Sequence, residues 1–232
     1  MAIKILGICG TPVKGETNTG YLIQMIMENC RRQGDDVETE VIYLASKKIA
    51  SGCTHCNWCL EKQTREKICA INDDWTNEIA PKLVEADALV WASPVYLMRM
   101  TWLMACYLDR HRAFGEGRYY GIRGPGMQRT HRFRPVLSAA VAWVTHAGVE
   151  TTLQVLCQTA AFLEYIPVTG GFGLGVAGIS AAPLGDLGAV RKDPAAISSA
   201  QTGSMRLVEL TRIIKAGRET LLRMPAYVEA SK

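Results

Sequence analysis

The sequence predicts an α/β protein built on a doubly wound, parallel sheet. Five β-type segments alternate with helical segments along the 232 residues, which is the order that βαβ units produce. Two of the β-type segments, ADALVWASPVYL and LSAAVAWV, are apolar at both odd and even positions, as strands covered by helices on both faces are. The length suits one domain with a sizeable core, so we expect residues 1–232 to form a single unit.

The first half of the chain sets the order of the strands. IKILGICG predicts a strand, and TGYLIQMIMENCRRQG predicts a helix because Leu22, Ile26 and Cys30 recur at helical spacing. DVETEVIYL alternates apolar residues with Glu38 and Glu40, which predicts an edge strand with one face in water. This polarity fits five parallel strands in the order 2-1-3-4-5. In that order a ligand binds beyond the carboxyl ends of strands one, three and four.

The remaining segments complete the alternation. MTWLMACYLDRHRAF and GVETTLQVLCQTAAFLEY predict helices, and IPVTGGFGLG predicts a fifth strand that runs into a glycine-rich loop. MRLVELTRIIKAGRETLLRM predicts the last helix. The Gly-, Ala- and Ser-rich segment 177–203 precedes that helix, and we expect it to run over the surface.

Composition limits the partners and the cellular compartment that we expect for the protein. The net charge of +4 is mild and gives no indication of nucleic acid as a partner. No apolar stretch reaches the ~18 residues that a membrane span needs, and the first residues lack the features of an export signal. We therefore expect a soluble cytoplasmic protein in which eight cysteines are free thiols or metal ligands rather than disulfides. The scattered Cys9, Cys30, Cys106 and Cys157 are expected to be buried small hydrophobes.

The stretch CTHCNWCLEKQTREKIC concentrates the other four cysteines. Cys53, Cys56 and Cys59 lie at two-residue intervals, and the nine-residue spacer LEKQTREKI separates them from Cys69. Thiolates at this spacing can converge on one [4Fe-4S] cluster, provided that the spacer loops out or forms a helical turn. Two alternatives stay open: structural zinc, with four cysteines or with His55 replacing one, and free or redox-sensing thiols without metal.

Two loops predict a ligand site at the carboxyl edge of the sheet. GTPVKGETNTG, residues 10–20, places hydroxyl, amide and glycine residues at a helix start, where backbone N–H groups and the helix dipole attract a phosphate. The loop lacks both the GK[ST] ending and the GxGxxG pattern. Asn18 or Thr19 is expected to cap the helix. SPVYLMRMTW follows the third strand, where Tyr96 offers a flat ring for stacking. Asp73 and Asp74 are expected to cap a helix that begins near Trp75.

The GTPVKGETNT loop, the cysteines leading into CAINDDW, SPVYLMRMTWLMACYLDRH and HAGVETTLQVL together resemble the flavodoxin-like NADPH-dependent FMN reductase superfamily, and most closely its iron-sulfur flavoprotein branch. The resemblance covers roughly residues 3–215. It implies a flavodoxin-like sheet with a cysteine-cluster loop insertion, residues 51–74, before the third strand. It further implies FMN-binding residues on the phosphate side, along the ring and at its far edge: Thr11, Val13, Asn18, Thr19; Pro94, Val95, Tyr96; and the loop from His146 to Gly148.

The same resemblance implies a flavin-dependent oxidoreductase. Electrons would pass from a two-electron donor, NAD(P)H among the candidates, through FMN to or from a [4Fe-4S] cluster on Cys53, Cys56, Cys59 and Cys69, and no acid–base residue is required. Clusters in that family approach flavins across subunits, which implies a homodimer or homotetramer. The expected partners are small-molecule or protein electron donors and acceptors, with no nucleic acid and no membrane. The alternatives are an NAD(P)H:FMN or quinone reductase without a cluster, and a zinc-stabilised flavodoxin-like binding module without turnover.

The loop 117–135 interleaves arginines with aromatic residues. Nucleic-acid binders use such mixtures, but a polar connection before a central strand is equally typical of a solvated or subunit-contacting loop. A site for the NADPH phosphate is a third interpretation, and the sequence leaves the role of this loop open.

Overall fold

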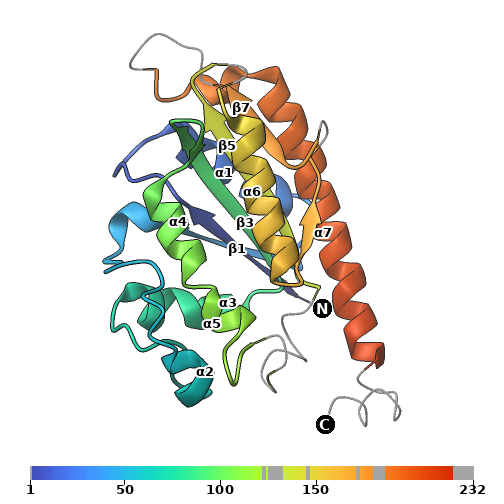
Figure 1. The fold of residues 1–232 in the computed structure, drawn as a ribbon. Helices are drawn as coiled ribbons and strands as arrows, with labels where there is room; N and C mark the ends of the chain where they lie inside the picture. Colours follow the sequence, from blue (N-terminus) through green and yellow to red (C-terminus); the bar gives the residue numbers. More distant parts are fainter. Residues whose placement is uncertain are drawn as a thin grey trace.

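The structure is a computed structural model that describes residues 2–121, 124, 133–144, 147–170, 173–179 and 186–221. Its centre is a twisted sheet (Figure 1). The main path runs in the order β2-β1-β3-β5-β6, with parallel pairing throughout. These strands are β1 (Ile3–Cys9), β2 (Val37–Tyr43), β3 (Ala88–Tyr96), β5 (Pro135–Ala142) and β6 (Ile166–Val168). They are the five predicted segments in the predicted order of neighbours, with β2 at the edge.

The prediction of five strands is nevertheless wrong, because the described residues form a sheet of seven strands. β4 (Arg99–Met100) turns back antiparallel to the end of β3, through Leu97 and Met98, both of which have positive φ. That geometry suits a two-residue hairpin turn, but the usual Asn or Gly signal is missing. β7 (Val176–Ile179) pairs with the second half of β5, whereas β6 pairs with the first half.

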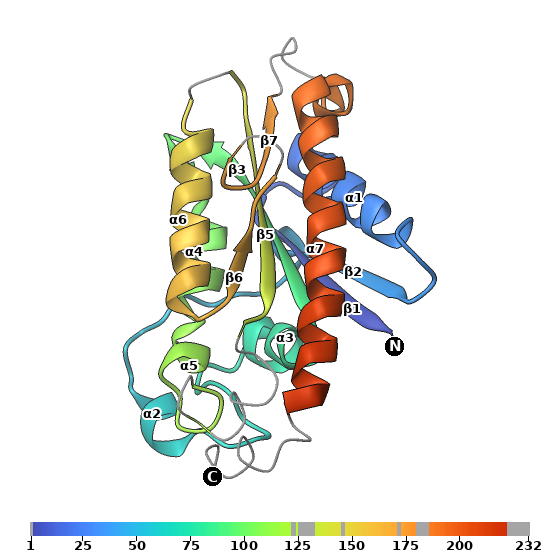
Figure 2. The same ribbon diagram turned by 90° about the vertical axis from the view of Figure 1, so that its right-hand side faces the viewer.

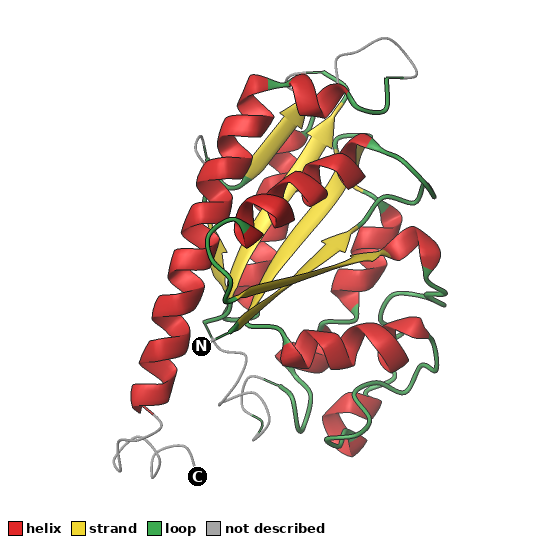
Figure 3. Ribbon diagram, turned by 180° about the vertical axis from the view of Figure 1, so that it is seen from behind, coloured by secondary structure: helices red, strands yellow, loops and turns green. Residues whose placement is uncertain are grey.

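Helices cover both faces of the sheet, as Figures 2 and 3 show. α1 (Asn18–Arg31) and α7 (Pro194–Leu221) lie on one face; α3 (Ala80–Glu85), α4 (Trp102–Asp109) and α6 (Val149–Phe162) lie on the other. Each face buries its own apolar cluster, one including Leu22, Val90 and Leu207, the other including Trp91. Burial of Ala88 through Ala92 and of all of β5 matches the apolar pattern that predicted two central strands.

The helix boundaries differ from the predicted ones at two places. The helix expected after the third strand is divided into α4 and the short α5 (Arg112–Gly115). The segment 177–203, expected on the surface, contains most of β7, a 3-10 turn (Ala189–Lys192) and the first ten residues of α7. Val190, Ala196 and Ala200 are fully buried there. Small side chains let this part of α7 approach the sheet closely, as at Gly203, where an added Cβ would lie 3.0 Å from Leu137.

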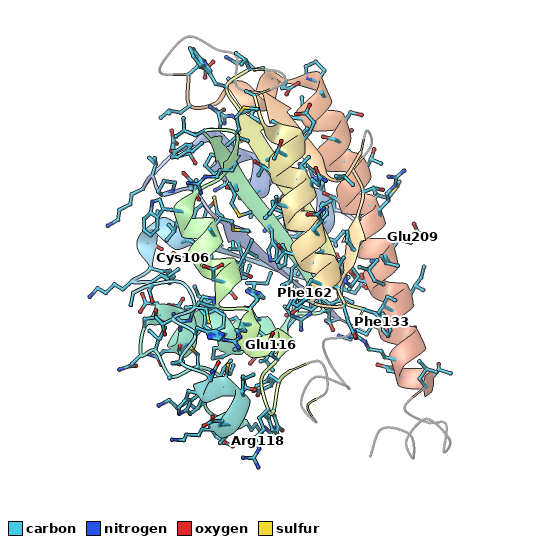
Figure 4. All side chains as sticks on the ribbon, viewed as in Figure 1. Cys106, Glu116, Arg118, Phe133, Phe162 and Glu209 are labelled. Atoms are coloured by element: carbon cyan, nitrogen blue, oxygen red, sulfur yellow. The ribbon has the colours of Figure 1, made fainter. Side chains whose placement is uncertain are left out.

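Burial also tests the expectation for the scattered cysteines. Cys9, Cys30 and Cys157 are buried as predicted, whereas Cys106 on α4 is only partly buried (Figure 4). Burial raises the pKa of the Cys9 thiol to about 11 and that of Cys30 to about 12. Among the described residues, no helix combines the length and the apolar character needed to cross a bilayer.

Candidate functional site

Hydrogen bonds join the loop after β1 to the first turn of α1 and to the residues that precede α7. Thr17, not Asn18 or Thr19, caps α1, because its Oγ1 accepts a hydrogen bond from the Gly20 N–H at 3.0 Å. The Asn18 side chain instead donates to the Asp186 carbonyl and accepts from the Val190 N–H, at 3.2 and 2.9 Å. The predicted cap is therefore wrong, and the Asn18 side chain is committed to holding a segment more than 160 residues away.

The other two predicted phosphate-side residues lie at the start of the same loop. Thr11 is 2% exposed, and its Oγ1 accepts from the Val13 N–H at 3.3 Å, while the Val13 side chain is exposed. Thr19 is buried in the first turn of α1. Backbone N–H groups at the positive end of the α1 dipole are thus the groups that the loop can offer an anion.

A cavity of about 490 Å³ opens beside this loop. It lies between the loop, the first turns of α1 and the chain that follows β2. Its lining includes Lys14, Gly15, Thr17, Tyr21, Tyr43 and Ser46. Gly15 has φ +88, and nothing lies within 4 Å of the position that a Cβ would take, so the backbone of the loop is open to a ligand on this side.

The hairpin at the end of β3 forms the second wall. Val95 pairs with Met100 and Tyr96 with Arg99, and the Tyr96 side chain remains 46% exposed. Thr101, directly after β4, donates from Oγ1 to the Gly10 carbonyl at 2.6 Å. The hairpin and the start of the phosphate loop are therefore tied together, while the role of Pro94, Val95 and Tyr96 beside a flavin ring stays a prediction.

Gly148 brings a third segment to the same place. It is the N-cap of α6, with φ +93, and an added Cβ would lie 2.5 Å from the Met98 Cα. The backbone of the α6 start therefore packs directly on the hairpin turn, which no other residue type allows without displacement. His146, predicted in the same loop, lies outside the described residues.

This end of the molecule carries exposed apolar side chains. They come from the loop after β1, the hairpin turn, the start of α4 and the end of β5: Val13, Tyr96, Leu97, Met98, Trp102, Trp143 and Val144. Leu97 alone is 93% exposed. A gathering of this kind marks a surface that binds a ligand or another protein.

The cysteine segment lies between β2 and α3. Cys53 and Cys56 are exposed, and Cys59 and Cys69 are half-buried and pack against the core. A short helix, α2 (Trp58–Lys62), includes Cys59 and the first three residues of the spacer, and the rest of the spacer is not helical. Burial raises the pKa of the Cys59 thiol, Arg112 lowers it, and Cys69 and Cys53 raise it further, so these side chains are electrostatic neighbours.

The four thiols suit an iron-sulfur cluster in their chemistry, since cubanes take four cysteine thiolates. Cys53 and Cys69 both act electrostatically on Cys59, while Cys56 is exposed. Within the described residues, no group of three His, Cys, Asp or Glu side chains is already arranged to hold a metal ion. The donor set therefore fits the group in its chemistry, while its described arrangement is not that of a formed metal site.

A buried ion pair holds the two ends of the cysteine segment together. Arg110 donates to Asp73 at 3.0 Å, and both side chains are at least 96% buried. Asp73 also accepts from the backbone N–H groups of Ala50 and Thr76, and the second of these bonds confirms the predicted role of Asp73 at a helix start. Asp74 differs: its carboxylate accepts from the Lys48 N–H. The two carboxylates therefore join residues before the cysteines to residues after them.

Gln63 fixes the middle of the segment. Its Nε2 donates to the carbonyls of Ile68 and Ala113, each at 2.9 Å, and its Oε1 accepts from the N–H groups of Tyr119 and Tyr120. The side chain is 4% exposed. Every polar atom of this buried amide is satisfied, so the turn before Cys69 is held against the chain that follows α5.

The 117–135 loop is only partly a surface feature. Tyr120 and Arg134 are buried, and Arg134 donates to the Leu83 carbonyl at 2.6 Å. Arg118 is exposed and donates to the Glu61 carbonyl in α2. Arg123, Arg129 and Arg132 lie outside the described residues.

Helix α4 separates the two candidate regions within the chain (Figure 1). Its N-cap, Thr101, binds the Gly10 carbonyl, and at its other end Asp109 lies against Gly52, where an added Cβ would be 2.5 Å from Oδ2. The helix has eight residues, or about 12 Å of length. The phosphate loop and Cys53 thus lie at opposite ends of one helix.

The fold and the site together define a flavodoxin-like α/β protein with its ligand edge at β1, β3 and β5. A family model described as NADPH-dependent FMN reductase matches residues 3–177. The chain belongs to this family of flavin-dependent oxidoreductases, and within it to the iron-sulfur flavoprotein branch. An iron-sulfur flavoprotein of Archaeoglobus fulgidus is 30% identical over 228 residues, which cover 94% of this chain and 100% of that protein.

Two further comparisons agree with this placement. An iron-sulfur flavoprotein of Methanocaldococcus jannaschii is 28% identical over 218 residues, which cover 92% of this chain and 100% of that protein. The crystal structure of RosB with bound 8-demethyl-8-formylriboflavin-5'-phosphate has a TM-score of 0.70 at 17% identity, covering 94% of this chain and 82% of RosB. At that identity the likeness concerns the fold.

Sequence reasoning missed several residues that organise the site. Thr17 was placed in the loop but not as the cap, and the roles of Gln63, Arg110 and Arg112 were not anticipated. Arg110 and Gln63 bind partners as far as 59 and 57 residues away, and no local pattern signals such pairs. Asp73 was found because a carboxylate before Trp75 is a local helix-start signal.

Proposed function

We propose that this FMN-dependent oxidoreductase moves electrons between FMN and a [4Fe-4S] cluster bound by Cys53, Cys56, Cys59 and Cys69. When bound, FMN supplies the exchange of electrons in pairs and the cluster their exchange one at a time. The protein's own residues bind these groups, orient them and tune their potentials. A single observation carries the proposal: the four thiols stand on one segment whose base and middle are held by the buried Asp73–Arg110 and Gln63 contacts.

For FMN, the proposed contacts are those at the carboxyl edge of the sheet. The phosphate is held by backbone N–H groups of the loop from Thr11 to Thr19 and by the α1 dipole. Pro94, Val95 and Tyr96 line the ring, and Gly148 borders its far edge beside the hairpin turn. The Asn18 side chain acts indirectly in this account, since its bonds to Asp186 and Val190 hold the loop in place.

We also propose a homodimer or homotetramer in which the cysteine segment of one subunit faces the FMN of another. The two regions lie at opposite ends of α4 within one chain, and the exposed apolar side chains around the hairpin suit a subunit contact. NAD(P)H is the proposed two-electron donor, in keeping with the family's description, and a small molecule or protein accepts or delivers the single electrons.

Anaerobic purification followed by quantification of iron, sulfide, zinc and FMN tests the proposal. Flavin absorption bands together with a broad shoulder near ~400 nm, and iron and sulfide in about equal amounts, are the expected result. FMN without iron would contradict the cluster and favour the cluster-free NAD(P)H:FMN or quinone reductase. A colourless protein with zinc would contradict the whole proposal and favour the binding module.

A further inference from the structure

Arg112 occupies a fixed position beside the cysteine segment. It opens α5, and its chain neighbours His111, Ala113 and Phe114 are each no more than 3% exposed. The backbone at Arg112 is therefore anchored in the core, while its own side chain is half-buried and acts electrostatically on Cys59.

The Glu116 carboxylate holds the Arg112 guanidinium in place but leaves another of its N–H donors without an acceptor. The Arg112 Nε donates to the Glu116 carboxylate at 2.7 Å, with 21% of the Arg112 side chain exposed. Figure 4 shows Glu116 at the end of α5, near Arg118 and the turn of α2. The Nη1 of Arg112 is buried and has no hydrogen-bond partner among the described residues. A buried donor without an acceptor is costly, and it indicates that an acceptor belongs there.

Cysteines lie near this guanidinium. The Cys59 carbonyl accepts from the Arg118 N–H at 2.8 Å, so the chain that follows α5 lies directly against the cysteine segment. The Glu116 carboxylate raises the pKa of Arg112, and Cys53 contributes in the same direction. Burial raises the pKa of the Cys59 thiol, and the charge of Arg112 opposes that effect. The guanidinium is therefore within electrostatic reach of both Cys53 and Cys59.

An ordinary surface ion pair looks different. At the end of α1, Arg32 and Glu28 also form an Arg–Glu pair four residues apart, at 3.2 Å, but the Arg32 side chain is 70% exposed, and water satisfies its remaining donors. A buried Nη1 without an acceptor among the described residues distinguishes Arg112 from Arg32.

We propose that Arg112 donates an N–H hydrogen bond to a sulfur of the bound cluster and raises its reduction potential. This inference rests on the proposed function. One electron added to the cluster adds one negative charge, and a fixed cationic donor stabilises the more negative state. Glu116 offsets part of that effect, because its carboxylate lies on the same guanidinium.

The test is a redox titration of the anaerobically purified holoprotein, followed by electron paramagnetic resonance and visible absorption. At the potential where the wild-type cluster is half reduced, Arg112→Gln is expected to show a reduced-to-oxidised ratio about tenfold lower, or about 59 mV for one electron. Arg112→Lys keeps the charge and is expected to give a smaller decrease, and Glu116→Gln an increase. Arg32→Gln, the matched control, is expected to leave the potential unchanged.

Iron and sulfide content is measured on every variant. If Arg112→Gln does not retain the cluster, Arg112→Lys and Glu116→Gln decide the matter, and unchanged potentials in both would overturn the inference. An unchanged potential in a fully loaded Arg112→Gln protein would overturn it directly. Wild-type protein without iron would overturn the proposed function and this inference with it, whereas a loaded wild type with insensitive variants overturns the inference alone.

Discussion

Arg110 and Asp73 form an ion pair with 1% and 4% of their side chains exposed, and through Ala50 and Ser51 the pair also holds the chain that precedes the cysteines. Arg110 also donates to the Ser51 carbonyl and to the Thr76 hydroxyl, and its guanidinium lies 4.8 Å from the Trp75 ring centroid. A charged pair so deeply buried costs desolvation. The position of the pair indicates that, in spite of this desolvation cost, it fixes the geometry of the cysteine segment.

Asp73→Asn is expected to lower the free energy of unfolding by about 3–5 kcal/mol, because it leaves the Arg110 charge buried without its counter-ion. Urea unfolding of the holoprotein measures the loss. Glu85→Gln, which removes an exposed partner of Lys4, is the matched control and should change stability by less than about 1 kcal/mol. Equal effects of the two substitutions would contradict the role assigned to the pair.

Gln63→Leu is expected to destabilise the protein by at least about 3 kcal/mol, because two backbone N–H groups and two carbonyls lose their buried partner. Iron content per chain should fall as well, since the Ile68 carbonyl that Gln63 holds directly precedes Cys69. Gln33→Leu changes an exposed glutamine on a local bond and should affect neither. Full iron content in Gln63→Leu would show that the turn before Cys69 does not depend on this amide.

Gly148→Ala is expected to weaken FMN binding about tenfold and to cost about 1–3 kcal/mol of stability, because its φ of +93 and the Met98 backbone both oppose a Cβ. Fluorescence titration with FMN and urea unfolding measure the two effects. Gly217→Ala in α7, where nothing lies within 4 Å, should be neutral or slightly stabilising. Unchanged FMN affinity in Gly148→Ala would remove this glycine from the site.

His111 predicts a loss of stability on acidification. Burial lowers its pKa from 6.5 to about 4, so between these values the unfolded chain binds a proton that the folded chain does not. Stability therefore falls as the pH decreases from 6.5 to 4, by up to about 3 kcal/mol. Urea unfolding across this range should show the slope in the wild type and in His55→Gln, and a smaller slope in His111→Phe. An equal slope in His111→Phe would contradict the assignment.

Local patterns predicted those parts of the fold that local chemistry determines. Glu38 and Glu40 revealed an edge strand, and the apolar runs around Trp91 and Val136 revealed central ones. The hairpin after Tyr96 was missed because Leu97 and Met98 adopt positive φ without a Gly or Asn, and tertiary contacts with Gly148 hold them there. The start of α7 was missed because it lies in a Gly-, Ala- and Ser-rich segment whose composition is typical of a loop. Its small residues Ala196 and Ala200 instead pack on the sheet.

The candidate site likewise has parts that local sequence predicts and parts that it does not. Cysteine spacing and the loop residues Thr11 to Thr19 are sequence-local, and from them come the predicted ligands and the predicted phosphate side. The supports are not local: Asn18 binds Val190, Gln63 binds Tyr120, and the Arg118 N–H binds the Cys59 carbonyl. Such pairs exist only once the sheet has brought the segments together.

An anaerobic reductive titration, followed at once by visible absorption and electron paramagnetic resonance, tests the central claim most directly. If FMN and a [4Fe-4S] cluster exchange electrons in this protein, reduction should take up about three electrons per chain, two for the flavin and one for the cluster. The signal of a reduced cluster should rise while the flavin bands bleach. Uptake of about two electrons with flavin bleaching alone would contradict the claim.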